Sequence, residues 1–166
     1  QYPNNINLIE TGLFHRFDAT NILNKNLASI VTSIGLDHLD WLPKTEQTIE
    51  KIIYEKTSKL LDSTVIVAKQ STREISEIIK NTIKDNKSVK FFFNENYNFS
   101  SGENNFFYFE DKFGGLKLPT PNIKGQFQLE NISTAIATLR AIKEIKINDM
   151  QIKSGITKIN SIARLQ

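Results

Sequence analysis

The sequence contains no cysteine, no long apolar run and little net charge. Without cysteine it can form neither a disulfide nor a cysteine-ligated zinc site. It has no stretch of about 18 apolar residues, which excludes a transmembrane helix. Its 166 residues carry a formal net charge of +3, too weak a bias to indicate binding to nucleic acid or to a membrane surface. We therefore expect neither of those partners, and we expect the protein in the cytoplasm.

Three motifs that would assign a reaction directly are also absent. The chain has no GxxxxGK[ST] phosphate-binding loop and neither a GxSxG nor an HExxH motif. Its composition, 39% hydrophobic and 23% charged, is nevertheless that of a globular domain with a core, since domains commonly contain roughly 100–200 residues. Function must therefore be inferred from residues that the fold brings together.

Short apolar runs alternate with helical patterns over the first half of the chain. The runs are bounded by turn residues, as buried strands are, and they predict strands at 6–10, 27–34, 64–68 and 89–93. Apolar residues recur at helical spacing over 45–61 and 71–86. This alternation predicts an α/β fold with a mostly parallel sheet flanked by helices.

The second half has a different pattern. Residues 94–103 are polar and are predicted to form a turn, and 105–110 with 115–118 are predicted to form a small antiparallel strand pair. Two further helices are predicted at 128–145 and 148–159.

Two candidate side chains follow predicted strands. Glu10 ends the first strand, and His38 comes shortly after the second. Ligands of open α/β sheets bind beyond the carboxyl ends of the strands, so these residues could meet there, and a carboxylate suits a hard cation such as Mg²⁺. The alternatives are a plain loop acid for Glu10 and a capping or core histidine for His38.

Lys56 lies on the apolar face of the helix predicted at 45–61, seven residues after Ile49. A lysine on such a face must extend to solvent, pair with an acid or lose its proton. A neutral lysine can react, and a carbamate on it would be an anionic metal ligand. The alternative is a boundary lysine paired with an acid.

The segment 11–21 gathers polar residues that suit a ligand-binding loop. Arg16, Asp18, Thr20 and Asn21 are close together in the sequence, and polar loop residues on a rigid scaffold often bind ligands. The alternative is ordinary turn chemistry.

Five strings, in order along the chain, resemble motifs of the folylpolyglutamate synthases and dihydrofolate synthases. The strings are ETGLFHRFDATN (10–21), TSIGLDHLDWL (32–42), TIEKIIYEK (48–56), QLENISTAIATL (128–139) and ARLQ (163–166). They are similar to the family's E-V-G-L-G-G-R-L-D-A-T-N, T-S-I-x-L-D-H-x-D-x-L, T-x-E-x-I-A-x-E-K, H-Q-x-x-N-A-A-T-A-L-A-x-L and P-G-R-[FL]-[QE].

The resemblance implies a Mur-ligase-like enzyme. Residues 1–160 would be part of the central ATP-binding domain, and 161–166 the start of a linker to a C-terminal domain. The family adds L-glutamate to dihydropteroate or to the glutamate tail of a folate, with ATP as co-substrate. ATP phosphorylates the substrate carboxylate, glutamate attacks the acyl phosphate, and Mg²⁺ assists. We expect the full-length enzyme to be a monomer.

The resemblance also implies roles for individual residues. Glu10 and His38 match Mg²⁺ ligands, and Lys56 matches a lysine that is carbamylated in family members and can then bind a second cation; His38 and Lys56 would be catalytic. The residues that match the ATP contacts are Asn131 and Arg164, and those that match the pterin-binding stretch are Phe17, Asp18 and Ala19.

The chain also departs from the family pattern. Phe14 and His15 replace two glycines, which changes a loop that glycine allows to approach a ligand closely. The family's phosphate-binding loop would precede residue 1, and its C-terminal domain would follow Gln166, so we expect no ligase activity from this chain alone. The alternatives are a degenerate, non-catalytic remnant, a Mur-type peptidoglycan ligase, or a binding module.

Overall fold

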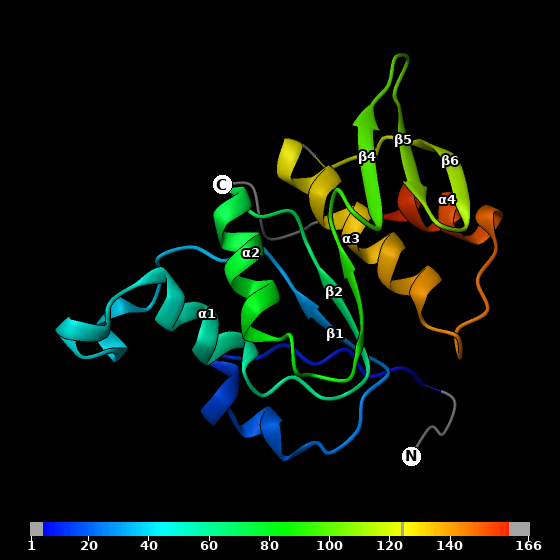
Figure 1. The fold of residues 1–166 in the computed structure, drawn as a ribbon. Coiled ribbons are helices and arrows are strands. Elements are labelled where there is room, and N and C mark those ends of the chain that lie inside the picture. The colour runs from blue at the N-terminus through cyan, green and yellow to red at the C-terminus, as the bar shows by residue number, and fades with distance from the viewer. Residues whose placement is uncertain (1–4, 124, 160–166) are drawn as a thin grey trace. The chain divides into compact units, whose positions relative to one another are not determined.

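The computed structural model describes residues 5–123 and 125–159, and Figure 1 shows its ribbon. These residues form two compact units, which we describe separately. The first unit contains 5–26, 34–61 and 71–86, and the second contains 27–33, 62–70, 87–123 and 125–159. No helix within the described residues has the length and apolar content that crossing a membrane requires.

The second unit contains a parallel sheet of three short strands, β1 (Ala28–Val31), β2 (Thr64–Val67) and β3 (Val89–Phe92). The strand order is β1-β2-β3, and Ile66 in the central strand lies opposite Ile30 and Phe91. Phe91 and Phe92 point to opposite faces and both are buried, as is typical of parallel sheets. Three of the four predicted strands are thereby confirmed.

A separate antiparallel sheet follows, with strands β4 (Tyr97–Ser101), β5 (Phe106–Asp111) and β6 (Gly114–Pro119). The predicted strand pair is therefore a three-stranded sheet, and the prediction of a turn over 94–103 was wrong. The turn-forming residues around β4 concealed its alternation, in which Tyr97 is buried and Phe99 pairs with Phe109 across the sheet. Such cross-strand aromatic pairs stabilise a sheet, but they become visible only once the strands are paired.

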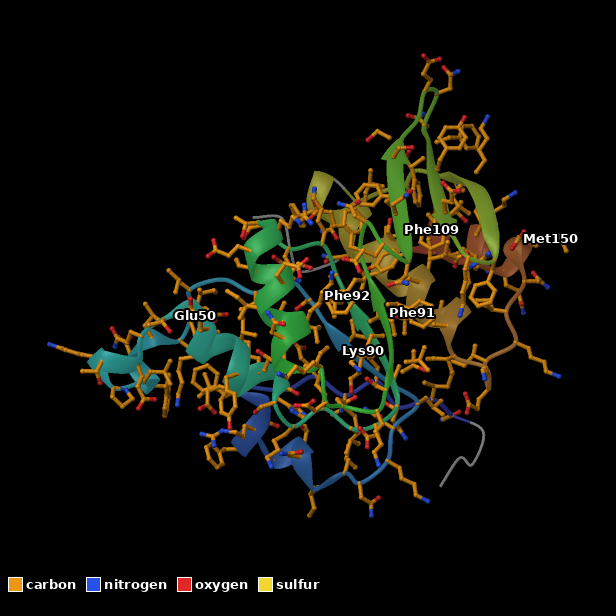
Figure 2. The ribbon with its side chains drawn as sticks, viewed as in Figure 1. Glu50, Lys90, Phe91, Phe92, Phe109 and Met150 are labelled. Carbon is orange, nitrogen blue, oxygen red and sulfur yellow. The ribbon has the colours of Figure 1, made fainter. Side chains whose placement is uncertain are left out.

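Two helices complete the second unit: α3 (Gln126–Ala141) packs against β2 and β4, and α4 (Asp149–Lys158) packs against β6. The core draws one face from each sheet and each helix. Figure 2 shows two of its members, Phe91 on β3 and Phe109 on β5. The fully buried Phe107 lies between the exposed Phe106 and Tyr108 along β5, so the strand buries alternate residues.

The first unit is built from short helices. Its α-helices, α1 (Ile49–Thr57) and α2 (Arg73–Thr82), pack against each other. Its 3₁₀ helices are η1 (His15–Phe17), η2 (Ala19–Ile22), η3 (Leu39–Trp41) and η4 (Lys44–Glu46). The helix predicted over 45–61 is shorter because the Thr48 side chain caps it, accepting a hydrogen bond from Lys51 N at 3.3 Å. Ile52 and Ile53 are fully buried, as predicted.

The first predicted strand was wrong. Residues 6–10 form neither strand nor helix, and Ile6, Leu8 and Ile9 are exposed. A strand requires a partner for its backbone N–H and C=O groups, and no described residue pairs with this segment. An apolar run supplies only the side chains of a strand.

Candidate functional site

A tight turn around Asp18 carries the first group of candidate site residues in the first unit. One carboxylate oxygen accepts hydrogen bonds from Thr20 N at 2.8 Å and Thr20 Oγ1 at 2.6 Å, and the other accepts one from Gly12 N at 3.0 Å. The hydroxyl and N–H of Thr20, with Gly12 N–H, lower the pKa of Asp18 because they favour the charged form. The carboxylate is thus held in a fixed place and ionised.

The side chains that flank Asp18 face solvent. Phe17 is 78% exposed, and Ala19 is exposed. A large apolar ring that is this exposed, beside a fixed carboxylate, offers a flat surface and a hydrogen-bond acceptor at one place.

Phe14 and His15, which stand where the resemblance would place two glycines, are packed into the unit. Phe14 is buried, and its ring meets the ring of His38 edge to face with centroids 6.2 Å apart. Burial lowers the pKa of His15, although Asp18 opposes this effect, and the buried Nδ1 of His15 has no hydrogen-bond partner. The bulkier side chains therefore fill this part of the loop.

A second group of charges joins the start of η3 to helix α1. Lys56 Nζ lies 3.3 Å from Asp37 Oδ2, and His38 Nε2 lies 3.8 Å from the same oxygen. His38 has a left-handed backbone with φ of 55°, a conformation that few residues other than glycine adopt. The structure thus brings His38 and Lys56 together through Asp37, which the sequence reasoning did not single out.

Lys56 lies where the alternative interpretation expects it, at the boundary of the buried face and paired with an acid. Its side chain is 24% exposed. An ammonium group in this position compensates Asp37.

Glu10 is not part of this group. It is exposed, and within the described residues it makes no hydrogen bond or ion pair. No three His, Cys, Asp or Glu side chains of the described residues are grouped closely enough to hold a metal ion. The expectation that Glu10 and His38 meet depended on a strand at 6–10, and without that strand the edge-of-sheet argument does not apply to Glu10.

A partly buried ion pair connects the turn to helix α1. Arg16 donates two hydrogen bonds to Glu55 from one edge of its guanidinium, Nε to Oε2 at 2.6 Å and Nη2 to Oε1 at 2.8 Å. The Glu55 side chain is only 4% exposed. Burial acts to raise the pKa of Glu55, but hydrogen bonds from Arg16 and Lys51 outweigh it and lower the pKa. Sequence reasoning listed Arg16 among loop residues and gave Glu55 no role, although Glu55 is a matched residue of the string TIEKIIYEK.

The residues that match ATP contacts lie elsewhere. Asn131 is exposed on α3 of the second unit, and its neighbour Glu130 pairs with Lys69 at 2.7 Å. Arg164 lies outside the described residues, as does the expected linker at 161–166.

Comparisons with known proteins point to one class, the folylpolyglutamate and dihydrofolate synthases. No protein-family model matches the chain. It is 29% identical to the dihydrofolate synthase/folylpolyglutamate synthase of Escherichia coli over 164 residues, 96% of this chain and 35% of that protein. It is also 29% identical to the protein of the same name from Buchnera aphidicola, over 100% of this chain and 37% of that protein.

Solved structures agree. The structure of E. coli FolC in complex with DHPP and ADP matches with a TM-score of 0.72 and 30% identity, over 89% of this chain and 33% of that one. The apo form of L. casei FPGS matches with a TM-score of 0.78 over 95% of this chain and 40% of that one, and at 22% identity it shows the fold alone. The chain spans about a third of the length of the curated relatives it matches over most of its length. It is similar to a segment of the dihydrofolate synthase/folylpolyglutamate synthases.

Proposed function

We propose that this chain contributes to an ATP-dependent ligase that joins L-glutamate to a folate or to dihydropteroate. The observation that carries the proposal is the similarity to the E. coli dihydrofolate synthase/folylpolyglutamate synthase over 96% of the chain. The first unit supports it, because the Asp18 turn and the group of Asp37, His38 and Lys56 lie within that one unit.

The proposed reaction has two steps. The substrate carboxylate attacks the γ-phosphorus of ATP, which forms an acyl phosphate and releases ADP. The amine of glutamate then attacks the acyl carbon, forms the amide bond, expels phosphate and loses a proton to solvent. Phosphoryl transfer of this kind needs positioning and positive charge from the enzyme more than covalent participation.

Mg²⁺ would neutralise the charge of the transferring phosphoryl group. In our proposal His38 and a carbamylated Lys56 hold it, and Glu10 is a predicted ligand from the resemblance alone, since it lies outside this group. The donor set fits such a cation on one condition: His38 and Asp37 offer an imidazole and a carboxylate beside Lys56 Nζ, but an ammonium repels a cation. A carbamate on Lys56 would reverse the sign of its charge and complete a set of anionic and neutral donors.

The pterin is proposed to bind at Phe17, Asp18 and Ala19. The exposed ring of Phe17 provides a face for a flat heterocycle. The Asp18 oxygens already accept hydrogen bonds within the turn, so a ligand N–H would share one of these acceptor oxygens. Asn131 and Arg164 are proposed to contact the adenine nucleotide and its phosphates, for which a guanidinium is suited.

A non-catalytic remnant is the second candidate. The observation that favours it is the packing of Phe14 and His15 into the loop where the resemblance expects glycines, with the buried His15 Nδ1 left without a partner. Such packing fills space that a ligand-binding loop would keep open.

Glutamate incorporation separates the two candidates. The longest in-frame polypeptide that contains this chain is incubated with ATP, Mg²⁺, radiolabelled glutamate and either dihydropteroate or a reduced folate. We expect a labelled product with at least one of them. No product with either substrate, from a folded protein, would favour the remnant. Incorporation by the isolated 166-residue chain would contradict our expectation that it is inactive alone.

Lys56→Gln tests the proposed role of the lysine. The change removes the amine that carbamylation requires, and we expect kcat to fall by at least about 10–100-fold, the range typical of damage to a metal site. Lys59→Gln removes an exposed lysine just beyond the same helix and is the matched control. Equal kcat for both variants would exclude the proposed role.

A further inference from the structure

The partly buried pair of Arg16 and Glu55 has no role in the reaction proposed above. Glu55 directly precedes Lys56 in α1, and Arg16 lies two residues before Asp18 in the turn. The pair therefore joins the two parts of the first unit that carry its proposed site residues, 39 residues apart in the sequence. It is a candidate for setting how those parts are placed relative to each other.

The contact between Arg16 and Glu55 is bidentate. Two parallel N–H···O contacts fix both the distance and the orientation of a guanidinium and a carboxylate. Lys51 Nζ adds a contact to Glu55 at 3.3 Å and another to Glu46 at 2.6 Å. The Glu55 side chain is only 4% exposed and that of Arg16 is 25% exposed, so water reaches the carboxylate little while the two contacts hold the guanidinium against it.

Arg16 also packs against the exposed ring of Phe17. Its guanidinium carbon lies 4.1 Å from the centroid of the Phe17 ring and 5.3 Å from that of Tyr54 on α1. Arg16 thus covers one face of Phe17, a ring that is otherwise 78% exposed, and a cation held over an aromatic face restrains the ring. In addition, the Arg16 carbonyl accepts a hydrogen bond from Asn21 Nδ2 at 3.0 Å, which closes the turn around Asp18.

We propose that Arg16, held by Glu55, is a positioning residue that presents Phe17 and Asp18 to the pterin part of the substrate. Glu55 fixes the guanidinium against α1, the guanidinium fixes the Phe17 ring, and the Arg16 carbonyl fixes the turn. This inference rests on the proposed function. It adds that recognition of the pterin depends on an ion pair which does not itself touch the ligand.

The test compares the Michaelis constants of the two substrates in Arg16 variants of the longest in-frame polypeptide. Arg16→Lys keeps the charge beside Glu55 but loses the two-point contact and the planar cover on Phe17. We expect the KM for the pterin substrate to rise on the order of tenfold to a hundredfold, the effect of small misplacement of binding groups. The KM for ATP should change by less than about twofold, since the pair holds no proposed ATP contact. A loss that is only structural would lower the amount of active enzyme and leave both KM values unchanged.

A double variant separates positioning from stability. Arg16→Met combined with Glu55→Leu removes both charges and leaves apolar groups in their place, a replacement that commonly preserves stability where a single removal does not. We expect its Tm to exceed that of Arg16→Met alone, while its KM for the pterin substrate stays raised. Glu77→Gln, which breaks the surface pair with Lys80 on α2, is the matched control and should leave both KM values as in the wild type.

The outcomes distinguish this inference from the proposed function. If the wild-type polypeptide has no ligase activity, the proposed function fails. If the wild type is active and the pterin KM of both Arg16→Lys and the double variant equals that of the wild type, Arg16 has no positioning role. A rise in the KM for ATP as large as that for the pterin substrate would also overturn the inference, because the effect would then not be local to the turn.

Discussion

The buried hydroxyl of Tyr97 makes the stability of the second unit depend on alkaline pH. Tyr97 is 2% exposed, and its Oη donates to the Val67 carbonyl at 3.0 Å and lies 3.2 Å from Thr134 Oγ1. It thereby joins β4 to β2 and α3. Burial raises the pKa of Tyr97 from 10.0 to about 12, although the Thr134 hydroxyl acts in the opposite direction.

The sign of the effect follows from which state binds the proton more tightly. Between pH 10 and about 12 the folded chain keeps the Tyr97 proton while the unfolded chain releases it, so the free energy of unfolding falls as pH rises. The contribution is fully present below pH 10 and is lost as pH passes about 12. One pKa unit corresponds to about 1.4 kcal/mol, so a shift of this size corresponds to a loss of roughly 3 kcal/mol.

Tyr97→Phe removes the titrating group and keeps the ring. At pH 8 we expect it to be less stable than the wild type by about 0.5–1.5 kcal/mol, the net value of a hydrogen bond. As pH rises, the wild type should lose stability faster, so that the two curves cross and Tyr97→Phe becomes the more stable protein near pH 12. Urea unfolding followed by circular dichroism at intervals from pH 8 to 12 measures both curves.

Tyr108→Phe is the matched control, because Tyr108 lies on the exposed face of the neighbouring strand. It carries the same substitution without the buried environment. Parallel curves for the wild type and Tyr97→Phe across the whole range would refute the reasoning, since they would mean that Tyr97 ionises equally in the folded and unfolded chains.

Two further predictions concern the core and the turn. Phe107→Ala, which removes a fully buried ring of the second unit, should lower the free energy of unfolding by about 3–5 kcal/mol in urea titrations, whereas Phe106→Ala on the exposed side of β5 should cost much less. Asp18→Asn should flatten the acid limb of the stability curve: hydrogen bonds from Thr20 and Gly12 lower the pKa of Asp18 from 3.8, so its contribution is present above pH 3.8 and is lost as pH falls through the lower folded value. Equal acid limbs for this variant and the wild type would contradict that assignment.

The strands of the parallel sheet could be predicted because their residues are buried on both faces. Runs such as TVIV at Thr64–Val67 contain only residues that suit a buried strand, and no pairing information is needed to recognise them. The segment 6–10 has a similar apolar content but remains irregular, and β4 has many polar residues but is a strand. In both cases the pairing of backbone groups decided the outcome, and pairing is a property of two segments.

The candidate site also has one part that could be predicted from the sequence and one part that depends on contacts in the folded chain. The positions of Asp18, His38 and Lys56 could be singled out from spacing and from the resemblance to a family. Asp37 and Glu55 also match letters of the strings that carry this resemblance, but their contacts could not be predicted: only the fold shows that Asp37 lies beside His38 and Lys56 and that Glu55 pairs with Arg16.

By itself, the sequence determined the α/β class, the helical faces of α1 and α2 and the series of strings that resemble motifs of the dihydrofolate synthase/folylpolyglutamate synthases. Those features depend on residue type and local spacing. Only the tertiary structure decided that Lys56 pairs with Asp37 and that Arg16 is held by the buried Glu55. It also decided that Tyr97 is buried and donates a hydrogen bond to the Val67 carbonyl. Each of these depends on burial and on contacts between distant segments, and those quantities exist only when the chain is folded.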